Sequence, residues 1–431
     1  MTQSVLTIVA DVEPAKVPEV RSAIDRIKAD PGGNPLLPFG QFDSLHFAAL
    51  VLAEAPGLAR PALILECNVD GSTKAWLAEL AGAGAAGLDA VFQGSPGYPG
   101  SADPAGLRSW LDEHVVRPGA FHIGATGRSV ARIRQEEQLH DAISAFLDEH
   151  ERAGGLNGAT SEEVRASVQA FVRGDPALQW AQGRPPLRQT MREKVVPRLR
   201  AVAAIAAAVA LLPILVPLVL VAFPLLVLKE RRDPVLTGLP DPDHVRGLEE
   251  DEDVGVLEDA RGRHLLCQNH LSSVIPVKPG MLRASLLPVV LFVLNLLARV
   301  TFTRGRLGGI PSIHFAHWTL IDRGRHLVFV SNFDGSWESY LADFIDKAAV
   351  GLTAVWSNTA DFPRTRYLVR AGAADGPRFR QWARANQCRH AAWYTAYPGL
   401  TMTAIDNNSA IREDLFTTLD HERTVQWLRR L

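Results

Sequence analysis

Cysteine is scarce in this sequence, and an excess of positive charge is absent. Its three cysteines, Cys67, Cys267 and Cys388, are scattered over 431 residues and form no C-x-x-C pair. That pattern excludes a disulfide framework and a closed zinc site, and it is typical of a reducing compartment. The formal net charge is −2, so no positive field predicts nucleic acid as a partner.

Several familiar motifs are also lacking. The chain contains no H-E-x-x-H, no G-x-S-x-G and no G-x-x-x-x-G-K-[ST], which argues against the common hydrolase and nucleotide-binding readings. Its start, MTQSVLTIVADVEPAK, lacks the basic beginning and long apolar run of a secretory signal, because Asp11 and Glu13 come too early. We therefore expect the domain that begins there to stay in the cytoplasm.

Charge is lacking altogether between residues 201 and 228, and a stretch of this length is normally assigned as a transmembrane helix. Pro213, Pro217 and Pro224 interrupt it, and both flanks are basic, with Lys194, Arg198, Arg200, Lys229, Arg231 and Arg232. Because positive residues prefer the cytoplasmic side, two basic flanks predict a segment that enters the membrane and returns.

What is present is an internal repeat. Residues 68–99 align without a gap on residues 332–363, and the phrase SLHFA at 44–48 returns as SIHFA at 312–316. Asn68, Asp70, Gly71 and Ser72 meet Asn332, Asp334, Gly335 and Ser336 in this alignment. Such agreement predicts an internal duplication.

Each copy predicts the same order of elements. In the first copy we expect a strand over 5–12, a helix over 17–29, strands over 45–53 and 62–69, a helix over 72–84 and a strand over 120–126. The second copy gives a strand over 264–277, a helix over 281–302, strands over 313–321 and 326–332, a helix over 336–356 and a strand over 391–399. This βαββαβ order predicts an α+β fold of two ferredoxin-like repeats, packed with each other or, in a homo-oligomer, with those of a partner chain.

The predicted organisation has three parts: residues 1–150 form the first repeat, 151–240 a helical linker with the apolar insert, and 241–431 the second repeat. If the repeats pack together, a single crossing by the insert would separate them, so we predict a shallow, monotopic contact with one leaflet. The helix 281–302 supports this prediction, because its centre is apolar nearly all round and Arg283, Arg299, Arg304 and Arg306 lie at its ends. Two alternatives remain: both segments are core helices of a large soluble protein, or the insert spans the membrane once. The residues expected to contact lipid are Leu212, Pro213, Leu215, Pro217, Phe223, Leu291 and Phe292.

Polar and aromatic groups found in only one copy are the candidates for a functional site. The second copy alone has His317 and Trp318, Trp337 and Glu338, and the arginines Arg364, Arg366 and Arg370, and its first strand carries Gln268, Asn269 and His270. His46 and His314 occur in both copies, which favours a structural role. Strand alternation places His314 and His317 on opposite faces, so they do not form a two-histidine metal site. Asp334 or Ser336, which follows a strand and opens a helix, is also expected as a helix N-cap.

Paired ferredoxin-like repeats with an Asp-Gly after a strand and an arginine nearby resemble the dye-decolourising peroxidase and chlorite dismutase superfamily of haem proteins. The resemblance covers both repeats but not the membrane segment. It implies haem as cofactor, Asp334 as the distal acid, and Arg364 or Arg366 as the group that polarises peroxide. SNFDG at 331–335 keeps only the Asp-Gly of the family's G-x-x-D-G motif. The family's proximal-histidine motif has no match, so His314 and His270 are iron-ligand candidates by chemistry, and His317 is a further catalytic candidate.

Three functional hypotheses follow. The first is a peroxidase-like oxidoreductase on the cytoplasmic face of the membrane that takes a lipid-soluble substrate from the bilayer. The second is a non-catalytic, membrane-associated scaffold or lipid-binding protein whose arginines bind lipid phosphates. The third is a lipid hydrolase or isomerase that uses His314 and Asp334 as an acid/base pair.

Overall fold

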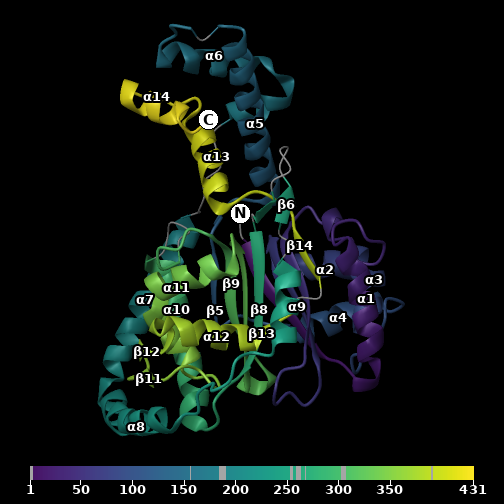
Figure 1. Cartoon of the computed structure of the whole chain (residues 1–431), viewed down its shortest axis with the longest axis vertical. Helices are drawn as coiled ribbons and strands as arrows, with labels where there is room; N and C mark the ends of the chain where they lie inside the picture. The colour runs from purple at the N-terminus through teal and green to yellow at the C-terminus, as the bar shows by residue number, and fades with distance from the viewer. Residues whose placement is uncertain are drawn as a thin grey trace.

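The computed structural model describes residues 3–155, 157–183, 191–252, 256–258, 264–266, 268–301, 307–389 and 392–431. Cys267, Arg304 and Arg306 lie outside these ranges. The chain is an α+β protein with two five-stranded antiparallel sheets. Figure 1 shows a body that contains both sheets, a helical lobe above it, and helices α7 and α8 along one side and the bottom.

The first sheet has the strand order β14-β2-β3-β1-β4. Four of its strands come from the N-terminal half of the chain, whereas β14 comes from near the C-terminus. The bounds are β1 (Gln3–Asp11), β2 (Leu45–Ala53), β3 (Ala62–Asp70), β4 (Val115–Val116) and β14 (Ala392–Thr395). Helices on its outer face are α1 (Val17–Ala29), α2 (Thr73–Ala83), α3 (Ala85–Phe92) and α4 (Pro104–His114).

The second sheet has the order β13-β8-β10-β9-β5. Here β5 is the strand contributed by the other half of the chain. The bounds are β5 (Ala120–Ile123), β8 (Gln268–Pro276), β9 (Ile313–Ile321), β10 (His326–Asp334) and β13 (Gln387–Cys388). Helices α10 (Met281–Thr301), α11 (Trp337–Trp356) and α12 (Gly376–Asn386) cover its outer face.

The edge strands β5 and β14 are therefore exchanged between the two halves. β5 pairs with β9, and β14 pairs with β2. Most of the expected strands and helices are found near their predicted bounds. The strand expected over 264–277 is found as two elements, β7 (His264–Leu266), which pairs with β6 (Val256–Glu258) in a separate hairpin, and β8. The last strand of each predicted repeat lies in the opposite sheet. The boundaries 1–150 and 241–431 consequently do not separate two structural units, because each half completes the sheet of the other.

The inner faces of the two sheets pack against each other. At one end of the interface an apolar cluster joins Val51, Ala53 and Ile64 of the first sheet to Val274, Ile321, Val328 and Val330 of the second. Towards the other end the interface contains buried polar side chains, which are described below.

The lobe is built from helices contributed by two distant parts of the chain: α5 (Val130–Arg152), α6 (Ser161–Gly174), α13 (Met402–Asp414) and α14 (His421–Leu428). These helices have an apolar cluster of their own that includes Leu139, Val168, Ile411 and Trp427. In the region predicted as a helical linker, α6 begins with a capping box between Thr160 and Glu163.

Between the lobe and the second sheet the chain forms α7 (Met191–Ala210) and α8 (Leu212–Arg232), followed by α9 (Pro242–Glu252). The break between α7 and α8 falls at Leu211, two residues before Pro213, whereas Pro217 and Pro224 lie inside α8. Proline is tolerated in the first turn of a helix, where its missing N–H is not needed. Two short hairpins complete the fold: β6 (Val256–Glu258) with β7 (His264–Leu266), and β11 (Thr365–Arg366) with β12 (Arg370–Ala371).

Candidate functional site

The predicted His–Asp pair exists, and it occurs twice. His314 Nε2 lies 2.6 Å from Asp334 Oδ1, and His46 Nε2 lies 3.1 Å from Asp70 Oδ1. Both histidines are fully buried. Each sits at an irregularity in its strand register, where its neighbours pair with the adjacent strand and it does not. A bulge of this kind turns a side chain out of strict alternation.

Each aspartate also binds the start of a lobe helix. Asp70 Oδ2 accepts a hydrogen bond of 2.9 Å from Val130 N, at the start of α5. Asp334 Oδ2 accepts one of 2.7 Å from Met402 N, at the start of α13. A carboxylate at a helix N-terminus is stabilised by the free N–H groups and the helix dipole. Because one oxygen of Asp334 binds His314 and the other binds the start of α13, the His314–Asp334 pair attaches the lobe to the second sheet.

The serine that follows each Asp-Gly pair is the N-cap of the next helix. Ser72 and Ser336 accept hydrogen bonds from Ala75 N and Ser339 N at the starts of α2 and α11. Gly71 and Gly335 have φ of +90° and +81°, a conformation that side chains rarely adopt. The alternative of Ser336 as N-cap is therefore confirmed, and Asp334 instead binds the start of a different helix.

A polar layer lies between the sheets beside these pairs. The side-chain amide of Asn332 donates to Asn68 Oδ1 at 3.0 Å, and its Oδ1 accepts from Trp393 Nε1 at 2.9 Å. His270 Nδ1 lies 2.8 Å from the same Asn332 oxygen, and His270 Nε2 lies 2.6 Å from Ser272 Oγ. Both ring nitrogens of His270 are therefore engaged in this network.

His317 and Glu66 belong to the same layer. His317 Nε2 lies 2.9 Å from Thr7 Oγ1, and burial lowers the pKa of His317 to about 3, so its imidazole is neutral at physiological pH. Glu66 accepts a hydrogen bond from the Asn68 amide, and burial raises the pKa of Glu66 to about 8. Glu66 Oε2 and His317 Nδ1 have no hydrogen-bond partner among the described residues. The position equivalent to Glu66 in the second copy is Val330. Glu66 was not among the residues predicted from the sequence to form a functional site.

The arginines predicted to act with Asp334 lie elsewhere. Asp334 ends β10 next to the lobe, whereas Arg364 and Arg366 follow the segment that pairs with the opposite end of the sheet, where Ala360 N donates to Pro276 O. Since the first and last of the nine residues of β10 are eight steps of about 3.4 Å apart, roughly 27 Å separates its two ends. The structure brings His314 and Asp334 together and leaves Arg364 and Arg366 apart from them.

The aromatic residues that distinguish the second copy also have structural roles. Trp337 is buried beneath Arg384, whose guanidinium carbon lies 3.8 Å from the centre of the ring. Glu338 forms an ion pair of 3.2 Å with the same arginine. The Gln268 side chain donates to the carbonyls of Tyr397 and Leu400.

Haem does not fit these residues as they stand. His314 binds Asp334 through Nε2, and its Nδ1 has no hydrogen-bond partner among the described residues, but the ring packs against Phe47 and Tyr397 with centroids 5.1 and 6.0 Å away. Both ring nitrogens of His270 are engaged. An aromatic cavity behind the second sheet measures about 30 Å³, and a cleft between β1, α4 and α10 measures about 710 Å³. Neither is lined by His270, His314, His317 or Asp334. Within the described ranges, no three His, Cys, Asp or Glu side chains gather as a metal site would require.

An exposed apolar surface lies on α7, α8 and α10. Two described helices are long and apolar enough to cross a membrane, namely α8 and residues 281–298 of α10. Of the residues predicted to contact lipid, Leu212, Pro213, Pro217, Phe223 and Phe292 are exposed, and Leu215 is half-buried. Other exposed apolar side chains on these helices are Leu199, Val202, Ile205, Val209, Ile214, Val216, Leu218, Val219, Leu220, Val221, Leu225, Leu228, Val289, Val293 and Leu297.

Two predictions about α10 need correction. Leu291 is only 1% exposed, because Arg283, Leu287 and Leu291 recur every four residues on the face that packs against the body. Arg283, which was expected at the headgroups, is also 1% exposed and binds Asp233 at 2.7 Å. The helix is therefore apolar on both sides, but only the side with Val289, Phe292, Val293 and Leu297 is open to the surroundings.

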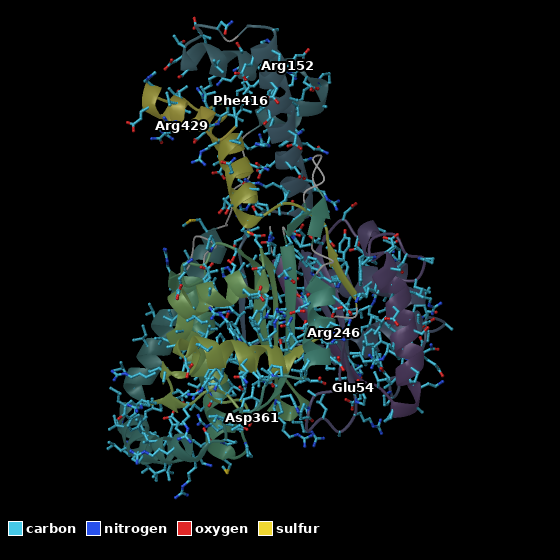
Figure 2. All side chains as sticks on the ribbon, in the orientation of Figure 1. Glu54, Arg152, Arg246, Asp361, Phe416 and Arg429 are labelled. Atoms are coloured by element: carbon cyan, nitrogen blue, oxygen red, sulfur yellow. The ribbon has the colours of Figure 1, made fainter. Side chains whose placement is uncertain are left out.

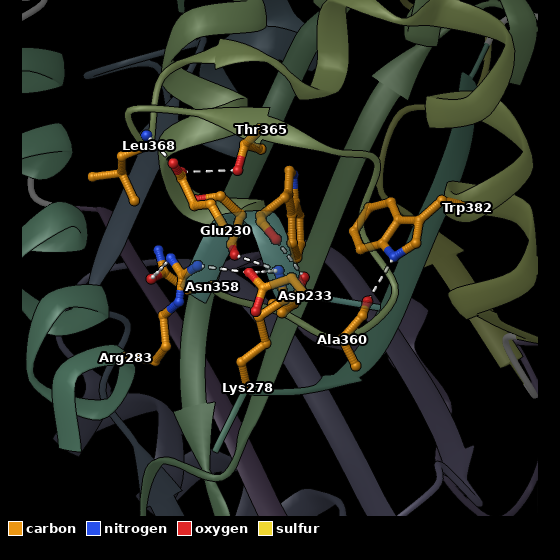
Figure 3. Close-up of polar contacts among 12 residues, drawn as sticks. Glu230, Asp233, Lys278, Arg283, Asn358, Ala360, Thr365, Leu368 and Trp382 are labelled. Atoms are coloured by element: carbon orange, nitrogen blue, oxygen red, sulfur yellow. Dashed lines mark hydrogen bonds and ion pairs between the residues drawn. The ribbon is translucent and has the colours of Figure 1, made fainter. Parts of the chain in front are cut away.

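A buried ionic cluster fixes the end of α8 to the body (Figure 3). Asp233 Oδ2 accepts from Lys278 Nζ at 2.8 Å and from Arg283 Nη2 at 2.7 Å. Lys278 also donates to Ser357 O, and Arg283 to Asn358 Oδ1. Burial lowers the pKa of Lys278, and the hydrogen bond that Lys278 donates to Asp233 opposes that change. One carboxylate shared by two buried cations is a strong restraint on where α8 ends.

Comparison with known proteins gives no relative: no family model, no curated protein and no solved structure matches the chain.

Proposed function

We propose that this protein is a monotopic membrane-surface protein that enters one leaflet with α7, α8 and the outer side of α10. The observation that carries the proposal is the exposed apolar surface of α8, where Leu220 is 70% exposed and Ile214 67%. Soluble monomers rarely expose apolar patches beyond a few hundred Å². Each such side chain transferred from water contributes about 1.5 to 3 kcal/mol, so a few of them suffice for binding.

The sheets favour a one-sided arrangement. Because β5 completes the second sheet and β14 completes the first, residues before α7 and after α8 form a single body. A single crossing would place the two halves on opposite sides of the bilayer and separate paired strands. Basic residues at both ends of the apolar segment, including the exposed Arg198, Arg200, Arg231 and Arg232, are consistent with entry and return at the cytoplasmic face.

The body itself is best explained as two ferredoxin-like repeats related by an approximate two-fold axis. Asn68 hydrogen bonds to Asn332, its own partner in the sequence alignment, and Phe47 contacts Phe315, with ring centroids 5.8 Å apart. Residues that touch their own counterparts lie on a two-fold axis. The doubled His–Asp pairs and the exchanged edge strands follow the same symmetry.

Membrane binding can be tested with one double variant. Ile214→Asp together with Leu220→Asp places two carboxylates on α8, each of which costs about 2.5 to 3.5 kcal/mol in the bilayer. We expect binding to phospholipid vesicles, measured by flotation, to fall at least about 100-fold. Leu239→Asp is the matched control, because Leu239 is 87% exposed but lies outside α7, α8 and α10. Equal binding by the double variant and the unmodified chain would contradict the proposal.

Topology needs a separate measurement. Protease sites fused to both termini should be cut from the outside when the protein has been added to preformed vesicles. In cells, both should be reached from the cytoplasm only. Protection of one terminus would mean that the insert crosses the bilayer and that the sheets of the body are assembled differently.

The peroxidase-like oxidoreductase that the resemblance implies has less support, because its acid and its arginines lie at opposite ends of the second sheet. A haem-dependent activity on a lipid-soluble substrate stays a prediction. It is tested by the visible spectrum of protein purified from cells supplied with haem, where a Soret band is expected if haem binds and its absence would contradict the haem hypothesis.

A further inference from the structure

The basic end of α8 and the β11–β12 hairpin together form a positively charged patch. Its members are Lys229, Arg231, Arg232, Arg364, Arg366 and Arg370, which we call the basic patch. All six side chains are exposed, and none forms an ion pair within the part of the chain that the structure describes. The chain as a whole has a net charge of −2, so this concentration of cations is local.

Glu230 holds the two parts of the patch together (Figure 3). Its carboxylate accepts hydrogen bonds from Thr365 Oγ1 at 2.9 Å, Tyr367 N at 2.8 Å and Leu368 N at 2.7 Å. Tyr367 and Leu368 form the turn of the hairpin with φ of +55° and +68°. A left-handed conformation at two successive residues with side chains is unfavourable, and the buried carboxylate stabilises it by binding both N–H groups.

Aromatic packing ties the hairpin to the lipid-facing helix as well. Phe223 of α8 stacks on Tyr367 with ring centroids 5.7 Å apart and an angle of 17° between the planes. Both side chains are more than two-fifths exposed. The arginines on either side of Tyr367 are therefore held at a set distance from the apolar surface of α8.

Neighbouring carboxylates leave the charge of the patch largely uncompensated. Glu230 is buried and committed to the hairpin, and Asp233 is committed to Lys278 and Arg283. Asp361, three residues before Arg364, is an exposed carboxylate near the patch in the sequence. A solvated surface normally mixes charges of both signs, so an apolar helix bordered by six exposed cations and few free carboxylates is typical of contact with headgroups.

We propose that the basic patch binds the phosphate groups of anionic phospholipids in the same leaflet that α8 enters. This inference rests on the proposed membrane docking and specifies its lipid class. Arginine suits phosphate because its planar guanidinium donates two parallel hydrogen bonds. Each basic residue near an anionic surface contributes about 1 kcal/mol.

The test compares two kinds of vesicle, one of phosphatidylcholine alone and one with about a third phosphatidylglycerol. The variant is R364Q/R366Q/R370Q, which removes three charges from the hairpin. The control is R26Q/R152Q/R429Q, which removes three exposed arginines. Arg152 and Arg429 lie in the lobe (Figure 2), and Arg26 belongs to α1, on the side of the body away from α8 (Figure 1).

The unmodified chain and the control should prefer the anionic vesicles, and the hairpin variant should lose about 100-fold in affinity for them while its binding to neutral vesicles stays unchanged. Equal losses in hairpin variant and control would show a general charge effect and overturn the proposal. Equal binding of the unmodified chain to both vesicles would also overturn it, while leaving membrane docking intact. If the unmodified chain binds neither vesicle, the proposed function itself fails, and this inference with it.

A competition arm separates lipid phosphate from free phosphate. Inorganic phosphate should release the protein from anionic vesicles no better than sodium chloride of the same ionic strength, because screening acts on both equally. Release by phosphate alone would show that the patch recognises a soluble anion instead of a lipid.

Discussion

Replacing Glu66 by glutamine should remove a pH dependence of stability that originates between the sheets. Glu66 is 1% exposed, and burial raises its pKa from 4.5 to about 8. Between these two values the unfolded chain has lost the proton and the folded chain still holds it. The folded state therefore becomes less stable as pH rises from about 4.5 to 8, and this contribution is constant outside that window.

The size of the effect follows from the two pKa values. Each tenfold change in proton affinity corresponds to about 1.4 kcal/mol, so the full change across the window is on the order of 5 kcal/mol, and roughly two thirds of it has occurred by pH 7. Glutamine has nearly the shape of the protonated carboxyl, and its oxygen can still accept the hydrogen bond from Asn68. The variant should therefore match the unmodified chain at pH 5 and be more stable by several kcal/mol at pH 8.

The assay is urea unfolding of detergent-solubilised protein, followed by tryptophan fluorescence at a series of pH values. Glu54→Gln is the control, because it removes one carboxylate from an exposed position and should shift stability little at any pH. A difference between Glu66→Gln and the unmodified chain that stays constant from pH 5 to 8 would refute the reasoning, since it would mean that Glu66 is already ionised in the folded protein.

Three further predictions follow from the same structure. Asp70→Asn and Asp334→Asn should each lower the free energy of unfolding by about 1 to 3 kcal/mol in urea titrations, because both carboxylates bind a histidine and a helix start; a large effect of only one would count against the two-fold relation. Asn332→Ala removes partners from Asn68, His270 and Trp393 together, so we expect a loss of about 3 kcal/mol or more by the same titration, and a loss under about 1 kcal/mol would show that the network is dispensable. Glu230→Gln should speed tryptic cleavage at Arg366 and Arg370, measured by mass spectrometry against Glu54→Gln, and unchanged cleavage would mean that the hairpin holds its turn without the carboxylate.

Much of the element order could be read from the sequence because alternation and helical periodicity are local properties. The strands Leu45–Ala53 and Ile313–Ile321 and the helix Val17–Ala29 fall at their predicted positions. The repeat also led to the polar positions, since Asn68 and Asn332 align and then bind each other. Aligned positions can contact each other because alternate side chains of a strand point towards the facing sheet.

What the sequence did not reveal was pairing over long distances. The sequence of the short strand AFHI at 120–123 does not indicate that it pairs with β9 and not with β1. An edge strand can form backbone hydrogen bonds with any free sheet edge. Strict alternation also failed at His46 and His314, where a bulge changes the direction of the side chain. The same limit applies to the arginines, which were grouped with Asp334 by sequence proximity although the length of β10 lies between them.

Burial of Leu291 and Arg283 shows a related limit. An apolar helix carries no periodic signal when one side packs on protein and the other side is open, because both sides then require apolar residues. The ion pair with Asp233, which explains why an arginine is accepted inside, joins residues fifty positions apart. Only the three-dimensional structure shows which side of α10 packs on the body and which side is exposed.

The exchange of β5 and β14 has a consequence for how the protein is made. On the ribosome, β2 emerges early, yet the strand that closes its free edge is synthesised some 340 residues later. The nascent chain therefore has an unpaired edge at β2 while its apolar helices are already leaving the ribosome. Productive synthesis should accordingly depend on something that shields this edge, a chaperone or the bilayer itself, and truncated chains that end before Ala392 should aggregate instead of accumulating as a stable half.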